Sequence, residues 1–101
     1  MTDALARLST ASRVLVVGPS GSGKTQLALR LGGLLGLPVV HLDAERWQPG
    51  WVALPDREWR EAVAGLVRAP RWIMDGTYES TLDVRLPAAD AVIVLERHRV
   101  A

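Results

Sequence analysis

The glycine-rich stretch GPSGSGKT, residues 18–25, constrains the fold of this chain more than any other segment. It directly follows RVLVV, residues 13–17, an aliphatic run that predicts a strand buried on both faces. Leucines at helical spacing come next: Leu27, Leu31, Leu34 and Leu35. Gly36 predicts the end of that helix, and Gly32 and Gly33 predict its close approach to a sheet. The order strand, glycine loop, helix predicts the first unit of an α/β fold.

The loop fits the phosphate-binding pattern G-x-x-x-x-G-K-[ST] at Gly18, Gly23, Lys24 and Thr25. Glycines allow successive N–H groups to turn inward at the positive end of a helix, where they hold phosphate oxygens. Lys24 is the one lysine among twelve basic residues, and its compact ammonium suits the β and γ phosphates inside a closed loop. The Thr25 hydroxyl is an oxygen ligand for Mg²⁺. The loop therefore predicts a site for ATP and Mg²⁺, formed by consecutive residues: Gly18, Pro19, Ser20, Gly21, Ser22, Gly23, Lys24 and Thr25.

Three further apolar runs predict strands: residues 38–43, 72–75 and 91–95. They alternate with helical patterns, which predicts parallel pairing. Because the carboxyl ends of parallel strands meet at one edge of a sheet, we expect Asp75 to hold Mg²⁺ opposite Thr25. The alternative for Asp75 is a plain turn with Gly76. Asp43 is expected to orient or deprotonate an acceptor hydroxyl, and its alternative is the cap of a helix or turn.

Two further segments have helical patterns. Residues 55–68 predict a helix with Pro55 at its first position. Its expected buried stripe consists of Trp59, Val63, Leu66 and Val67. Residues 80–86 predict at most two helical turns before Pro87, and the polar segment 44–51 predicts a loop.

The composition excludes several classes of protein. A chain of 101 residues, 49% hydrophobic and 23% charged, predicts one folded domain. The net charge of +1 arises from interspersed charges, which gives no support for binding to nucleic acid or to a membrane. The chain has no cysteine, and its two histidines lie far apart, so a structural zinc site is not expected. No apolar run is long enough to span a bilayer and no secretory signal is recognised, so we expect a cytoplasmic protein.

The four tryptophans raise the hypothesis that aromatic rings stack on nucleic-acid bases. Trp59 lies on a predicted helix stripe and Trp72 in a predicted strand, so packing in the core explains both. Trp47 and Trp51 lie in the predicted loop, where we expect them to line an acceptor pocket. His41 is interpreted as a strand residue near that pocket. Nucleic acid is therefore not an expected partner.

The chain closely resembles the bacterial adenylate-kinase-like proteins often labelled DNA topology modulation proteins, a P-loop kinase family. Three segments carry the likeness within residues 13–99: GPSGSGKT, LGLPVVHLDAERWQPGW and RWIMDGTYESTLDVRLPAADAVIVLE. The resemblance implies a nucleoside-monophosphate-kinase-type fold with strand order 2-3-1-4-5, ATP as phosphate donor and a phosphorylated small molecule as product. It also implies roles at matching positions: Asp43, Arg46, Trp47 and Trp51 on the acceptor side, Asp75 and Gly76 after the third strand, and Arg85 at the transferred phosphate.

Members of this family continue after the fourth strand through an arginine-bearing lid, a fifth strand and a closing helix. We therefore expect this chain to be the N-terminal part of such a domain, with strand order 2-3-1-4. The fourth strand is then an apolar edge prone to self-association. Because lid arginines supply charge at the γ-phosphate, the chain alone is expected to lack part of the transfer machinery.

The function expected from these observations is that of an ATP-dependent phosphotransferase, a kinase of a nucleotide or another small molecule. The first alternative is a nucleotide-binding or regulatory module that does not transfer phosphate. The second is a nucleic-acid-associated ATPase, which the balanced charge disfavours.

Overall fold

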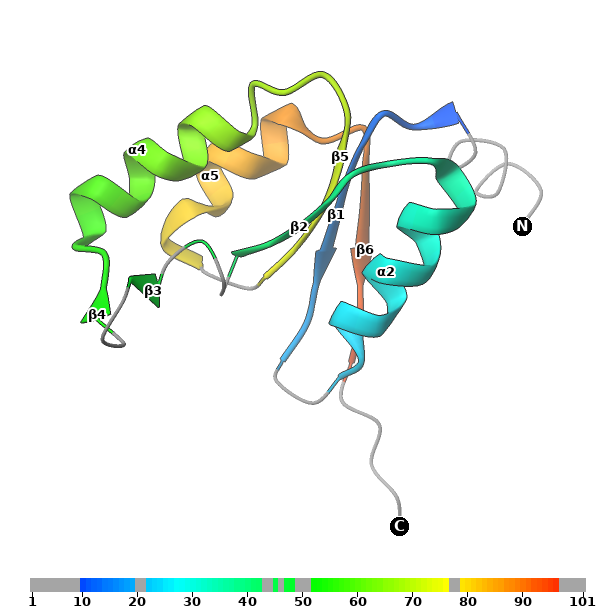
Figure 1. Ribbon diagram of the computed structural model, residues 1–101, viewed down its shortest axis with the longest axis horizontal. Coiled ribbons are helices and arrows are strands. Elements are labelled where there is room, and N and C mark those ends of the chain that lie inside the picture. The colour runs from blue at the N-terminus through cyan, green and yellow to red at the C-terminus, as the bar shows by residue number, and fades with distance from the viewer. Residues whose placement is uncertain are drawn as a thin grey trace, which may run out of the picture.

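Four parallel strands form the centre of the computed structural model, which describes residues 10–19, 22–42, 45, 47–48, 52–76 and 79–96 (Figure 1). Across the sheet the strands follow one another in this order: β2 (Val39–His41), β5 (Trp72–Asp75), β1 (Arg13–Val17) and β6 (Ala91–Val94). Each neighbouring pair is parallel. The predicted α/β class and the expected strand order 2-3-1-4 are therefore confirmed.

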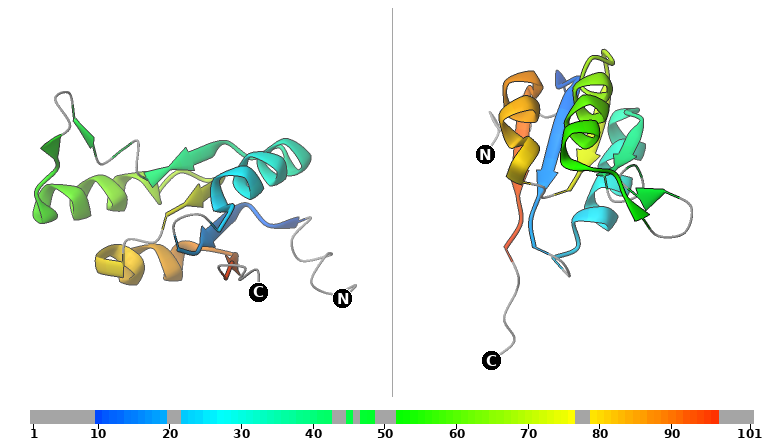
Figure 2. Two further views of the ribbon diagram at one scale, coloured as in Figure 1. Left: turned by 90° about the horizontal axis from the view of Figure 1, so that it is seen from below. Right: turned by 90° about the vertical axis from the view of Figure 1, so that its left-hand side faces the viewer.

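Helices cover both faces of this sheet (Figures 1 and 2). One face carries α2 and the other carries α4 and α5, with these bounds: Lys24–Leu35, Asp56–Leu66 and Leu82–Arg85. The central strand β1 serves both layers because its successive side chains point to opposite faces. Val14 and Val16 pack in one cluster with Ala28 of α2, whereas Leu15 packs in the other with Trp59 of α4. All five of these side chains are fully buried.

Small residues bring α2 close to the sheet. Ala28 and Gly32 are its buried residues, and a Cβ atom added to Gly32 would lie 2.5 Å from Val39 Cγ2. The expected close approach is therefore confirmed at Gly32, but it is wrong at Gly33, where an added Cβ meets no atom within 4 Å. Leu34, one of the leucines at helical spacing, lies about 200° around the helix from Gly32 and is 80% exposed, so it is not on the face that packs on the sheet.

The two adjacent glycines give a matched pair of variants. We expect Gly32→Ala to lower the free energy of unfolding by about 1–3 kcal/mol, because the new methyl group overpacks the contact with β2. Gly33→Ala is expected to raise it by up to about 1 kcal/mol, since alanine favours the helix and the added atom meets open space. Urea unfolding of both variants measures the difference. A change of the same sign in both would contradict the close approach.

The segment between β2 and α4 contains more structure than expected. Two short strands, β3 (Trp47–Gln48) and β4 (Val52–Ala53), pair in antiparallel fashion where the sequence predicts only a loop. Pro55 has an extended backbone, with φ −56° and ψ 151°, so α4 begins one residue later than predicted, at Asp56. The predicted stripe of α4 is confirmed, with these side chains buried or partly buried against the sheet: Trp59, Val63, Leu66 and Val67.

The helical segment after β5 is longer than predicted. A 3₁₀ turn at Glu79–Thr81 leads into α5, and a second one at Leu86–Ala88 continues past Pro87. The proline is accommodated because it lies in the first turn of that second 3₁₀ helix, where its missing N–H has no partner to lose.

Strand β6 lies at the edge of the sheet as the structure describes it. Its side chains alternate, and Val92 and Val94 are 42% and 69% exposed. The predicted apolar edge is thus present among the described residues, whereas self-association through it stays a prediction. None of the helices that the structure describes combines the length and the apolar character needed to cross a bilayer.

Candidate functional site

The predicted phosphate loop connects the carboxyl end of β1 to the first residue of α2. The chain leaves β1 after Val17, and the N–H of Ser22 donates to the carbonyl of Pro19 at 3.2 Å, which closes a tight turn. The N–H of Leu27 then donates to the carbonyl of Gly23 at 3.0 Å and starts the helical pattern. Two members of the predicted site, Ser20 and Gly21, lie outside the described residues.

The structure explains why the pattern has glycine at both Gly18 and Gly23. A Cβ atom at Gly18 would lie 2.8 Å from Ser22 Oγ and 2.9 Å from the carbonyl oxygen of Leu95, so the loop leaves no space for a side chain there. Gly23 precedes α2 with φ 88°, a left-handed conformation that glycine adopts without strain. The hydroxyl oxygen of Ser22 is buried and accepts or donates no hydrogen bond within the described structure. The loop therefore contains a buried polar atom that its own fold does not satisfy.

A hollow of about 350 Å³ opens at the N-terminus of α2, and its lining among the described residues consists of Gly23, Lys24, Thr25 and Gln26. The first turn of this helix contains no acidic residue, and no side chain caps it. Lys24 is half-buried, and no ion pair or hydrogen bond of its side chain occurs within the described part of the chain. A cation at the positive end of a helix is unfavourable by itself. The described lining thus combines a lysine with the positive end of a helix, and an anion is the natural complement.

Asp75 lies at the same edge of the sheet as the loop. It is the last residue of β5, it pairs in register with Val16 of β1 and with His41 of β2, and it is only 3% exposed. The N–H of Gly76 donates to the carbonyl of Val16 at 3.2 Å, which ties the turn after β5 to β1. The expectation that Asp75 stands beside the phosphate loop at the carboxyl edge of the sheet agrees with this register.

His41 contacts Asp75 directly, through its Nδ1 atom and the carboxylate Oδ2. From the sequence, His41 was expected in a strand near the acceptor pocket, without a role of its own. The contact could have been inferred from the position of His41, because His41 and Asp75 each end a strand of the same parallel sheet. Which strands are neighbours decides whether such residues meet, and β2 and β5 are neighbours.

Arg85 is fully buried at the end of α5. Its Nε donates to Thr81 Oγ1 at 3.1 Å, and its NH1 donates to the carbonyl oxygen of Gly76 at 3.0 Å. Burial lowers the pKa of the Arg85 guanidinium. These bonds fix the turn that follows Asp75, and contact with a transferred phosphate stays a prediction for this residue.

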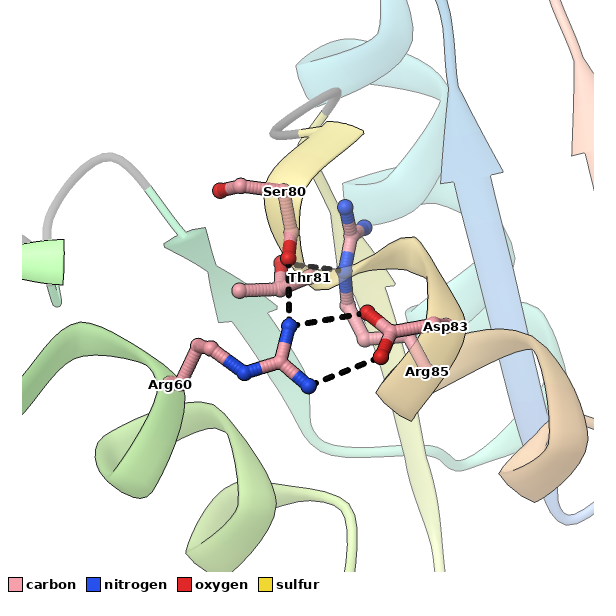
Figure 3. Close-up of polar contacts among 5 residues, drawn as sticks. All are labelled: Arg60, Ser80, Thr81, Asp83 and Arg85. Atoms are coloured by element: carbon pink, nitrogen blue, oxygen red, sulfur yellow. Dashed lines mark hydrogen bonds and ion pairs between the residues drawn. The ribbon is translucent and has the colours of Figure 1, made fainter. Parts of the chain in front are cut away.

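A surface ion pair joins α4 to α5, between Arg60 and Asp83 (Figure 3). The Arg60 guanidinium donates to both carboxylate oxygens of Asp83, at 2.9 and 2.7 Å, and to the carbonyl of Ser80 at 2.7 Å. Figure 3 shows the next link, where Thr81 receives the bond from Arg85. The hydrogen bond from Arg60 lowers the pKa of Asp83, and the pKa of Arg60 is raised in return. Helix α4 is thus joined through α5 to the turn at Gly76.

Two exposed carboxylates predict a loss of stability in acid. The pKa of Asp83 is lowered by Arg60, and that of Asp90 is lowered by hydrogen bonds from the N–H groups of Ser12 and Arg13. A carboxyl with a lowered folded-state pKa stabilises the fold above its ordinary pKa of 3.8, and this contribution is lost as the pH falls through the folded-state value. We expect stability to be level above about pH 5 and to fall below pH 3.8, with a shallower fall in Asp90→Asn. Thermal unfolding from pH 7 to pH 2 measures it, and equal slopes in both proteins would contradict it.

The two residues predicted to hold Mg²⁺, Thr25 and Asp75, carry oxygen donors. Within the described residues no three His, Cys, Asp or Glu side chains gather to form a metal site. Mg²⁺ commonly uses one or two protein oxygens together with phosphate oxygens and water. Thr25 is exposed at the hollow and Asp75 ends β5 at the same edge of the sheet, and their joint binding of Mg²⁺ stays a prediction.

Several predicted residues lie where the structure gives no description: Asp43, Arg46 and Trp51. Trp47 starts β3, and its role on the acceptor side stays a prediction. The other two tryptophans are buried, as predicted, with Trp59 in α4 and Trp72 in β5. Comparison of the chain with family models, with curated proteins and with solved structures finds no match.

Proposed function

We propose that this protein binds ATP with Mg²⁺ at the N-terminus of α2 and transfers the γ-phosphate to a nucleotide or another small molecule. The observation that supports this most strongly is Lys24, a half-buried cation at the positive end of a helix whose first turn has no acidic residue. Without an anion this arrangement is unfavourable for the helix, whereas a bound phosphate gives Lys24 a counter-charge and gives the N–H groups of the first turn an acceptor. The hollow of about 350 Å³ offers space for that group.

Each residue of the site has a definite task in this proposal. Lys24 binds the β and γ phosphate oxygens, and the N–H groups of the loop bind the others. Thr25 and Asp75 hold Mg²⁺, which when bound offsets the negative charge that develops during phosphate transfer. Asp43 orients the acceptor hydroxyl or accepts its proton. The four-stranded parallel sheet with helices on both faces is compatible with a P-loop NTPase fold, the fold of the family that the sequence resembles.

A second function, nucleotide binding without transfer, is favoured by Arg85. The residue implied to touch the transferred phosphate is fully buried and donates to Thr81 and Gly76 instead. If no other arginine takes its place, a site with Lys24 alone binds a triphosphate and stabilises the transition state poorly. The third candidate, an ATPase acting with nucleic acid, is weakened because Trp59 and Trp72 are buried and offer no stacking surface.

One experiment separates these functions. ATP is titrated into the wild-type protein by calorimetry with and without Mg²⁺, and ADP formation is then followed with a panel of nucleosides, nucleoside monophosphates and other small phosphate acceptors. Binding together with ADP formation that depends on an acceptor is the expected result. Binding without ADP formation supports the second function. A protein that does not bind ATP at all contradicts both.

A further inference from the structure

The histidine that ends β2 and the aspartate that ends β5 form a pair at the proposed site. His41 and Asp75 are partners in the strand register, so the sheet itself holds their backbones side by side. The side chain of Asp75 is 5% exposed and that of His41 is 34% exposed. One member of the pair is therefore inside the protein, and the other reaches toward solvent.

The direction of the hydrogen bond follows from the chemistry of the two groups. In the proposed function Asp75 holds Mg²⁺ as an ionised carboxylate, which only accepts hydrogen bonds, so that function requires the proton of this contact on Nδ1 of His41. Among the described residues, His41 is the side chain that donates to Asp75. A buried carboxylate with one oxygen fixed in this way has its rotamer set by the histidine, and the other oxygen remains available for a further partner.

We propose that His41 is a positioning residue, which holds the Asp75 carboxylate in the orientation needed for the divalent cation that accompanies ATP. This inference rests on the proposed function. Residues that orient a metal ligand through a hydrogen bond commonly change metal affinity by about 10–100-fold when they are replaced. A bond that only stabilises the sheet would leave the effect of the cation unchanged, so the two roles differ in a measurable way.

Asparagine is the matched replacement for this histidine. Its amide nitrogen, like Nδ1 of histidine, lies one bond beyond Cγ, so His41→Asn keeps a donor at the place that contacts Asp75. His41→Ala removes the donor. ATP affinity is measured for the wild-type protein and both variants in excess EDTA and in Mg²⁺, and the ratio of the two affinities gives the contribution of the cation.

We expect His41→Ala to bind ATP in EDTA as tightly as the wild-type protein does. In Mg²⁺, its increase in ATP affinity is expected to be about 10-fold smaller than that of the wild type, and His41→Asn is expected to restore the increase. An unchanged gain in His41→Ala, or an equal loss in both variants, overturns the inference and leaves the proposed function standing. A wild-type protein without affinity for ATP overturns both. If His41→Ala does not fold, ¹⁵N spectra of the wild-type imidazole together with His41→Asn decide the matter. We expect the wild-type imidazole to carry its proton on Nδ1, and we expect His41→Asn to keep the full gain in ATP affinity from Mg²⁺. An unprotonated Nδ1 overturns the inference.

Discussion

Replacing Lys24 with alanine is expected to weaken the binding of Mg·ATP by at least about 100-fold while leaving the fold intact. The ammonium makes charge-assisted hydrogen bonds to phosphate, each of about 1.5–3 kcal/mol, and two such bonds correspond to that loss of affinity. The free energy of unfolding is expected to stay equal or to rise by up to about 1 kcal/mol, because Lys24 lies at the positive end of α2 with no acidic residue in the first turn. Calorimetric titration and urea unfolding measure the two quantities.

Arg30 provides the control for this prediction. It lies on the same helix, is exposed, and does not line the hollow, so Arg30→Ala removes the same charge from α2 at a distance from the site. We expect its ATP affinity to remain within about 2-fold of the wild-type value, since an exposed charge outside the contact is largely screened by salt. Equal losses in Lys24→Ala and Arg30→Ala would show that net charge, and not the loop, attracts the nucleotide.

Patterns within one segment predicted the strands of this fold well. The run Arg13–Val17 forms β1, and its three central residues are fully buried, as expected for a strand covered on both faces. The resemblance to a known family supplied the strand order, which spacing alone does not determine. Gly36 ends α2 with φ 68° and donates its N–H to the carbonyl of Gly32, so the predicted end of this helix was also correct.

The distance of a helix from the sheet and the pairing of short strands could not be predicted from patterns within one segment. The leucine spacing did not show which side of the helix is buried: Leu34 is 80% exposed, and Gly32 brings the helix so close to β2 that the buried face is centred on the glycine. A periodic pattern gives the direction of a side chain and not the separation of two elements. The same limit applies to β3 and β4, whose pairing depends on a cross-strand contact that single residues do not indicate.

The candidate site was predictable where it is local in sequence and unpredictable where it joins distant segments. Gly18 to Thr25 are consecutive, so one pattern contains the whole loop. His41 and Asp75 are 34 positions apart, and their contact requires β2 and β5 to be neighbours. Likewise, the burial of Arg85 follows from the turn at Gly76, which accepts its hydrogen bond.

That turn is held in a conformation that few residues adopt. Gly76 has φ 148°, a region that side-chain-bearing residues rarely enter. An added Cβ atom would lie 2.6 Å from Leu42 Cδ1 and 2.8 Å from Leu42 Cβ, and Leu42 is fully buried in the cluster that contains Trp59. The backbone of Gly76 also bonds to Val16 and to Arg85, so the turn connects the sheet to α5.

Gly76→Ala is therefore expected to lower the free energy of unfolding by about 2–6 kcal/mol, the sum of about 1–3 for backbone strain and about 1–3 for overpacking against Leu42. A loss of this size is a large part of the roughly 5–15 kcal/mol that stabilises a domain. Gly65→Ala in α4 is the control, because its new methyl group meets nothing within 4 Å and alanine favours the helix. Urea unfolding of both measures the contrast, and a Gly76→Ala protein as stable as the control would show that the turn at Asp75 tolerates a side chain.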